Sequence, residues 1–312
     1  MNAGKIRAIC ISEKRGTVKH EVDNAVLKEG YGIEGDAHAG SWHRQVSLLS
    51  ACAVDDFNEL GAGVKPGDFG ENIIVEGIDC LSLPVGSILT LGEEEPVKLK
   101  ITQKGKECHT HCQIYKRMGE CIMPHKGIFA EVILGGKISR GDLVSVEYPD
   151  ENRPFRVAVI VLSDRASAGE YNDLSGPKAC EILKGKGYEI IESMVIPDDK
   201  DRLKAELIRL SDGREADLII TSGGTGFSPR DITPEVTLEV AERNAPGIAE
   251  YMRMRSVEVT DRAMLSRGVS AIRGKTLIVN LPGSPKAVEE CLGFILGALE
   301  HGLKILRGNA CE

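Results

Sequence analysis

The first half of the chain is a series of short apolar runs separated by turn residues. Turn signals such as Lys65-Pro66-Gly67-Asp68 and Gly135-Gly136 divide the runs, and the amphipathic stretch Ser50–Leu60 predicts a helix. Many short strands at this spacing are typical of an antiparallel barrel or sandwich. The predicted strands are Arg7–Ser12, Gln45–Leu49, Asn72–Val75, Ser87–Leu91, Val97–Thr102, Phe129–Leu134 and Leu143–Tyr148.

The second half alternates between strands and amphipathic helices. The continuous apolar run Arg156–Leu162 is typical of a strand that is covered on both faces. Further strands are expected at Glu189–Val195, Asp217–Thr221 and Thr276–Asn280. Four helices are expected between and after these strands. The first is capped by Ser175, the second spans Asp201–Leu210, and the last two begin at Pro234 and Pro285.

These two patterns predict two domains. We expect a mostly antiparallel β-barrel over residues 1–148 and an α/β doubly wound, mostly parallel sheet over residues 155–312. The polar stretch 149–154 lies between prolines and is the expected linker.

Composition narrows the possible partners. The net charge of −8 argues against nucleic acid and anionic membranes, and 4% aromatic residues leave few platforms for base stacking. No run is long enough to span a membrane, and the N-terminus does not resemble a signal peptide. The nine cysteines are therefore expected to be reduced thiols in the cytoplasm.

The loops that follow the predicted parallel strands favour an anionic ligand. Such strands gather their following loops at one end of the sheet. The first two are 162–173, which contains Ser163 and Asp164, and 196–201. In loop 221–235, Gly223, Gly224 and Gly226 allow backbone N–H groups to converge on an anion, and Thr225 adds a hydroxyl group.

The remaining loop, 280–288, makes a second tight turn at Pro282-Gly283-Ser284-Pro285, where a helix begins. Carboxylates at Asp198, Asp199 and Asp231 could hold Mg²⁺ against a triphosphate. The alternatives are that the glycines merely mark a turn and that Asp198 and Asp199 merely begin a helix.

The motifs TSGGTGFSPRDITPE, VLSDRASAGEYNDLSGP and AMLSRGVSAIRGKTLIVNLPGSP resemble the molybdopterin-binding family, which includes the molybdopterin adenylyltransferases of molybdenum-cofactor synthesis. The resemblance covers about residues 155–312. It implies Mg²⁺-dependent transfer of AMP from ATP to molybdopterin with release of pyrophosphate, and a homo-oligomer, trimeric or hexameric. Other cofactor-synthesis proteins are possible partners.

The resemblance also implies the site residues. Asp199 or Asp198, together with Asp231, would be catalytic, with Asp199 and Asp231 as metal ligands. By its own chemistry, and not by the resemblance, Arg230 beside Asp231 would contact a phosphate or form a structural ion pair. The cofactor-binding residues would be Ser163, Asp164, Thr221, Ser222, Gly223, Gly224, Thr225, Gly226, Pro282, Gly283 and Ser284.

A cluster of thiols and imidazoles lies in the first half, at Cys108, His109, His111, Cys112, Cys121 and His125. Three interpretations stay open: a zinc site formed by Cys108, Cys112, Cys121 and His125, a reactive thiol among lysines, or ordinary buried cysteines.

The motifs GIEGDAHAGSWHRQVSLLS, GDFGENIIVEGID and GIFAEVILGGKISRGDLVSV resemble the MOSC domain, a β-barrel module. This resemblance covers about residues 1–148 and implies cofactor binding, or sulfur carried on a cysteine. Cys108, Cys112 and Cys121 are the candidate thiols, and molybdenum is a candidate ligand of one of them. Gly35, Asp36, His38, His43 and Arg44 form a second polar cluster. Arg44 and His43 are candidates for binding an anionic pterin phosphate, and the alternative is that they are solvated loop residues.

Together these features predict a two-domain protein of molybdenum-cofactor biosynthesis. A non-catalytic carrier or storage protein and a nucleotide pyrophosphatase are the alternatives.

Overall fold

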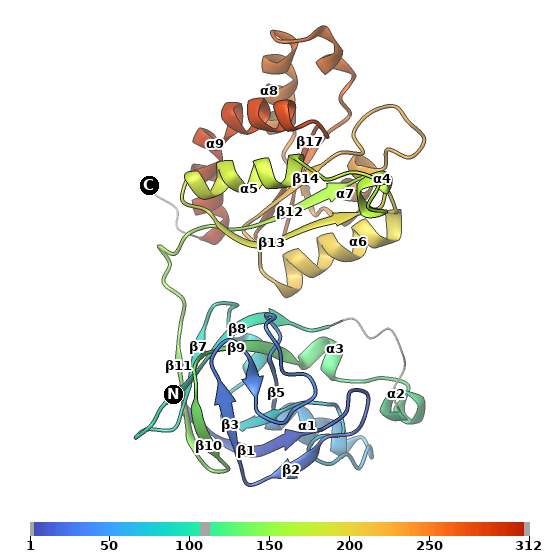
Figure 1. The fold of residues 1–312 in the computed structure, drawn as a ribbon. Coiled ribbons are helices and arrows are strands. Elements are labelled where there is room, and N and C mark those ends of the chain that lie inside the picture. The colour runs from blue at the N-terminus through green and yellow to red at the C-terminus, as the bar shows by residue number, and fades with distance from the viewer. Residues whose placement is uncertain (1–2, 107–112, 309–312) are drawn as a thin grey trace. The chain divides into compact units, whose positions relative to one another are not determined.

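The computed structural model describes residues 3–106 and 113–308. The chain divides into two compact units, Met1–Asp150 and Glu151–Glu312, and the division falls inside the stretch expected to be a linker (Figure 1). Each unit has its own apolar core and is described by itself.

Unit 1 is a closed, mostly antiparallel barrel, as the sequence predicts. Its strands follow the order β11-β7-β8-β9-β5-β6-β1, and pairing of β1 with β11 closes the barrel. Only the β5–β6 pair in the barrel is parallel among the described pairings, and β2 extends the sheet beside β1. Closure removes most of the exposed sheet edge.

The helices and strands of unit 1 have the following bounds: β1 Ala3–Ile11, β2 His20–Val22, β3 Asn24–Lys28, β4 Gly32–Ile33, β5 Val46–Ser50, α1 Ala51–Glu59, β6 Ile73–Glu76, η1 Cys80–Ser82, β7 Ile88–Leu91, β8 Val97–Lys104, α2 Gln113–Met118, α3 Met123–Lys126, β9 Ile128–Leu134, β10 Gly136–Ser139 and β11 Leu143–Glu147. The short strands β10, β3 and β4 form a separate small sheet.

Unit 2 is a doubly wound α/β sheet, which confirms the predicted fold class. Its strand order is β13-β12-β14-β17-β16-β15, and the first four strands are parallel. Helices α5, α8 and α9 pack on one face, and α6 and α7 pack on the other (Figure 1). The strand β12 is buried along its whole length because both faces are covered.

The helices and strands of unit 2 have the following bounds: β12 Arg156–Leu162, α4 Asp164–Ser167, α5 Ser175–Gly185, β13 Glu189–Ile196, α6 Lys200–Ile208, the π-helical turn η2 Arg209–Gly213, β14 Leu218–Ser222, α7 Thr233–Val240, β15 Arg243–Asn244, α8 Pro246–Val257, η3 Asp261–Leu265, β16 Ser270–Arg273, β17 Thr276–Leu281 and α9 Pro285–Arg307.

The start of α5 differs from the sequence prediction. Ser175 is the first helical residue and not the cap. The Asp173 carboxylate takes that role by accepting hydrogen bonds from the backbone N–H groups of Ser175 (2.9 Å) and Gly176 (3.0 Å). A carboxylate at this point also suits the positive end of the helix dipole. Across the described part of the chain, no helix is both long enough and apolar enough to cross a membrane.

Candidate active site

The loops after β12, β13, β14 and β17 meet at the carboxyl end of the sheet in unit 2. Contacts between residues far apart in sequence show this convergence. The Gly223 N–H donates to the Leu281 carbonyl at 3.2 Å. A Cβ added to Gly283 would lie 3.3 Å from Gly223 Cα. A Cβ added to Gly224 would lie 3.4 Å from Asp198 Oδ1.

Two glycines of the loop after β14 have no room for a side chain. Gly223 has a φ of 101°, and a Cβ there would lie 2.4 Å from the Leu162 carbonyl oxygen. Gly224 has a φ of 64°, and its Cβ would lie 2.3 Å from Thr233 Oγ1. Both the left-handed backbone and these close approaches require glycine.

The carbonyl groups of the loop after β14 point toward Thr233 and Arg267, and the N–H groups that follow them point the opposite way. The carbonyls of Gly223 and Gly224 accept from Thr233 Oγ1 (2.9 Å) and Thr233 N (3.1 Å). The next two, at residues 225 and 226, accept from Arg267 N (2.9 Å) and Arg267 Nε (2.6 Å).

In a trans peptide, the carbonyl and the following N–H point in opposite directions. The N–H groups of residues 224–227 therefore point away from Thr233 and Arg267, and none of them has an acceptor among the residues that the structure describes. Successive N–H groups of this kind form a concave site for an anion. We call residues 223–227 the anion cradle.

Asp198 lies at one side of the cradle and is half-buried. Its Oδ2 accepts from Asp164 N (3.1 Å), and its own N–H donates to Asp164 Oδ1 (2.9 Å), so the loops after β12 and β13 are tied together. Burial raises the pKa of the Asp198 carboxyl, and the neighbouring charge of Asp164 acts in the same direction.

Arg230 forms an ion pair with Asp164. Its Nη2 lies 2.7 Å from Asp164 Oδ1, and its Nε lies 3.0 Å from Oδ2. These hydrogen bonds lower the pKa of Asp164. Of the two alternatives for Arg230, the structure shows the ion pair, which joins the loop after β14 to the loop after β12.

The three candidate catalytic aspartates lie in different surroundings. Asp199 Oδ1 accepts from Arg202 N (2.7 Å), so this exposed carboxylate caps α6. Asp231 Oδ2 accepts from Ser228 N (2.9 Å), and the same oxygen lies 2.9 Å from where a Cβ on Gly226 would be. Asp198 and Asp231 therefore both lie beside the cradle, whereas the carboxylate of Asp199 faces its own helix.

The remaining predicted site residues in these loops mostly hold the loops in place. Thr221 is fully buried, and its Oγ1 accepts from Asn280 Nδ2 at 2.9 Å. Ser222 Oγ donates to the Pro282 carbonyl at 3.0 Å. Ser163 caps α4, and Ser284 caps α9 by accepting from Ala287 N at 3.2 Å.

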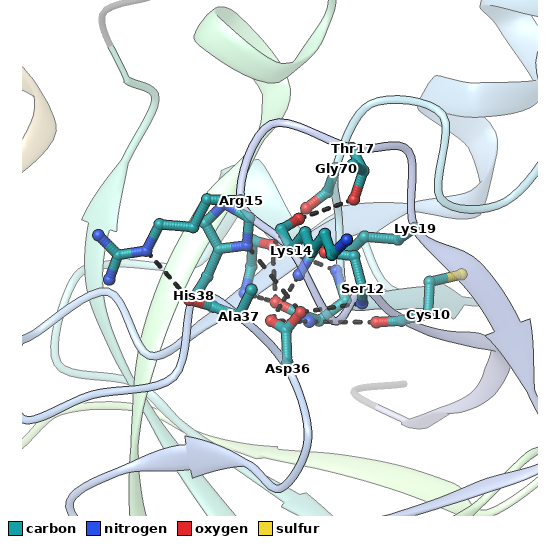
Figure 2. A network of polar contacts seen from close by, with 12 residues as sticks. Cys10, Ser12, Lys14, Arg15, Thr17, Lys19, Asp36, Ala37, His38 and Gly70 are labelled. Carbon is teal, nitrogen blue, oxygen red and sulfur yellow. Dashed lines mark hydrogen bonds and ion pairs between the residues drawn. The ribbon is translucent and has the colours of Figure 1, made fainter.

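The polar cluster expected in unit 1 separates into two groups. Asp36 is buried and pairs with the buried ammonium of Lys19 at 2.6 Å (Figure 2). Its carboxylate also accepts from Asn72 Nδ2 at 3.0 Å. Burial alone would raise the pKa of Asp36, but the hydrogen bonds from Lys19 and Asn72, and His38 Nδ1 at 3.9 Å from Oδ1, hold it well below its usual value. The contacts of Asp36 with Lys19 and Asn72 therefore hold loops of the barrel together.

The second group contains His43 and Arg44. His43 Nε2 lies 3.0 Å from Gln103 Oε1, and the Arg44 guanidinium lies over the rings of Trp42 (4.7 Å) and Phe129 (5.7 Å). Arg44 is half-buried at this position.

Of the candidate thiols, only Cys121 falls in the described structure. It is 8% exposed and belongs to an apolar cluster of unit 1, and His125 nearby in sequence is exposed. Cys108, His109, His111 and Cys112 lie outside the described residues. No group of three or more histidine, cysteine, aspartate or glutamate side chains suited to a metal occurs within residues 3–106 and 113–308.

Comparisons with known proteins agree with both units. Residues 158–301 match the family model described as "Probable molybdopterin binding domain", and residues 35–145 match the MOSC domain. The chain therefore belongs to the molybdopterin-binding family through unit 2, and it carries a MOSC domain in unit 1.

Individual relatives match unit 2. The molybdopterin adenylyltransferase of Helicobacter pylori strain J99 is 41% identical over 157 residues, which cover 50% of this chain and 89% of that protein. The molybdopterin adenylyltransferase of Escherichia coli K12 is 40% identical over 158 residues, which cover 50% of this chain and 76% of that protein. A crystal structure of the molybdopterin biosynthesis enzyme MoaB from Thermus thermophilus is 43% identical, with a TM-score of 0.48, and covers 49% of this chain and 97% of that chain.

Proposed function

We propose that unit 2 is a molybdopterin adenylyltransferase that uses ATP and Mg²⁺. In this reaction an oxygen of the pterin's terminal phosphate forms a bond to the α-phosphorus of ATP. The bond from that phosphorus to the bridging oxygen breaks, and pyrophosphate leaves with the electron pair. The observation that supports this most directly is the anion cradle. Its N–H groups have no acceptor within residues 3–106 and 113–308, and they lie beside two carboxylates.

Different segments of the site bind the two substrates. The N–H groups of residues 224–227 bind the phosphates that become pyrophosphate, so they stabilise the charge that develops as the bond breaks. The turn 282–284, with the N-terminus of α9, holds the pterin substrate. Backbone donors fixed in advance need no reorganisation during the reaction.

Asp198 and Asp231 fit a magnesium ion better than Asp199 does. Mg²⁺ is usually held by one or two carboxylates together with substrate phosphates and water, so a cluster of three protein ligands is not needed. Both carboxylates lie beside the cradle, whereas Asp199 already caps α6. The bound ion would neutralise charge on the phosphates.

We further propose that unit 1 receives the adenylylated pterin or the finished cofactor, with Arg44 contacting its phosphate and a cysteine handling sulfur or molybdenum. Tethering two units that act on one pterin raises the effective concentration of the intermediate. Assembly as a trimer or hexamer through unit 2 belongs to the same proposal.

The test is pyrophosphate release by the purified full chain. With molybdopterin, ATP and Mg²⁺ present, we expect release that depends on the pterin. Tight pterin binding without pyrophosphate release would instead indicate a carrier or storage protein. Hydrolysis of nucleotides without pterin would indicate a pyrophosphatase.

A further inference from the structure

Arg267 lies between η3 and β16, outside every loop so far assigned to the site, yet it contacts the cradle at several points. Its backbone N–H donates to the Thr225 carbonyl at 2.9 Å. Its guanidinium donates from Nε to the Gly226 carbonyl at 2.6 Å and from Nη2 to the Asp231 carbonyl at 2.7 Å. The third nitrogen, Nη1, pairs with Glu235.

These contacts fix both ends of the turn 226–231. Because the two carbonyls point to Arg267, the N–H groups of the following residues, Phe227 and Ile232, point away from it. The position of the Asp231 backbone also sets where its carboxylate lies beside the cradle. The ion pair with Glu235 orients the guanidinium, so the fork faces the two carbonyls.

We propose that Arg267 is a positioning residue for phosphate binding: it holds the cradle in the conformation that presents N–H groups to the substrate. The inference rests on the adenylyltransferase function proposed for unit 2. Arg267 acts through the loop and does not itself contact the substrate. A lysine cannot replace it fully, because a single ammonium lacks the planar fork that reaches two carbonyls at once.

Arg273 provides a matched control on the neighbouring strand β16. Its Nη1 donates to the Val240 carbonyl at 2.9 Å, and its Nε and Nη2 bind the carboxylate of Asp212 at 2.9 and 2.6 Å. Arg273→Gln therefore removes one carbonyl contact and one ion pair, and it touches no residue of the cradle.

The experiment compares full-length wild type, Arg267→Gln, Arg267→Lys and Arg273→Gln. Affinity for ATP with Mg²⁺ is measured by titration calorimetry, turnover by pyrophosphate release, and folding by thermal denaturation. We expect Arg267→Gln to weaken ATP binding and lower kcat by about tenfold or more each, since misaligned donors lose their interaction with the phosphates. The KM for molybdopterin should stay unchanged, because the pterin binds at the turn 282–284.

Arg267→Lys should fall between wild type and Arg267→Gln, and it serves as the second variant if Arg267→Gln does not fold. Arg273→Gln should lower the melting temperature without changing ATP affinity or kcat. The inference is overturned if the Arg267 variants keep wild-type ATP affinity, or if Arg273→Gln loses as much. If wild type binds no ATP, the proposed function itself fails, which is a distinct outcome.

Discussion

The two adjacent aspartates after β13 give the sharpest mutational test of the site. Asp198 lies beside the cradle, whereas Asp199 accepts from Arg202 N at the start of α6. The change Asp→Asn removes one negative charge at either position and keeps the shape of the side chain. The two variants should therefore behave differently although they are chemically the same.

The magnitudes follow from these surroundings. For Asp198→Asn we expect kcat/KM to fall about 100-fold or more, equivalent to about 2.7 kcal/mol of transition-state stabilisation, because the carboxylate proposed to hold Mg²⁺ is lost. Asparagine is as good an N-cap as aspartate, so Asp199→Asn should change stability by only a few tenths of a kcal/mol. Asp199→Ala should cost about 1 kcal/mol of stability through loss of the cap, with turnover retained.

The assay is pterin-dependent pyrophosphate release, with thermal denaturation to detect loss of folding. Asp231→Asn should resemble Asp198→Asn, because its carboxylate also lies beside the cradle, next to Gly226. Equal losses for Asp198→Asn and Asp199→Asn would refute the assignment of the two carboxylates. Full activity in Asp198→Asn would refute it as well.

Three further predictions concern the backbone and the buried charges. Gly224→Ala should destabilise unit 2 by about 1–3 kcal/mol and abolish nucleotide binding, because the left-handed backbone has no room for a Cβ. Asp36→Asn should cost about 3–5 kcal/mol, because the buried Lys19 loses its charged partner. Burial raises the pKa of Glu71 from its ordinary 4.5 to about 7, so the stability of unit 1 should fall by up to about 3 kcal/mol as the pH rises between these values. Glu71→Gln should remove that slope, and Gly185→Ala, in open space, is the neutral control for Gly224→Ala.

The measurements for unit 1 have a convenient probe. Trp42 is the single tryptophan of the chain and lies in unit 1, so its fluorescence during denaturation follows the barrel. The sign for Glu71 follows from proton binding: between about pH 4.5 and 7 the folded state retains a proton that the unfolded state has released. A wild-type stability that rises with pH relative to Glu71→Gln would contradict the burial argument, and an unchanged stability in Asp36→Asn would contradict the ion-pair argument.

Much of the fold could be predicted from local patterns. The run Arg156–Leu162 identified a doubly covered strand, and the parallel topology then placed its following loop beside the glycine loop. The N-cap of α5 is harder to predict from sequence, because both Asp173 and Ser175 are good capping residues and only the backbone conformation decides between them. The same difficulty applies to the roles of Asp198 and Asp199. The preference for aspartate at a helix N-cap, just before Lys200, is the one sequence signal that indicates Asp199 as the cap of α6.

Side-chain contacts between residues far apart in the sequence could not be predicted. Arg267 contacts carbonyls 41 and 36 positions away in sequence. It lies in the motif AMLSRGVSAIRGKTLIVNLPGSP, but the motif does not indicate which loop its side chain contacts. The buried Lys19–Asp36 pair was also beyond sequence reasoning, since both residue types are normally exposed. The sequence pattern instead groups Asp36 with Arg44, which the structure places beside aromatic rings.

The most direct test of the central claim is a crystal structure of the full chain with a non-hydrolysable ATP analogue and Mg²⁺. The account predicts phosphate oxygens within hydrogen-bonding distance of the N–H groups of residues 224–227, with the metal ion between Asp198 and Asp231. Phosphates bound away from this loop, or a metal ion held by Asp199 instead, would contradict it.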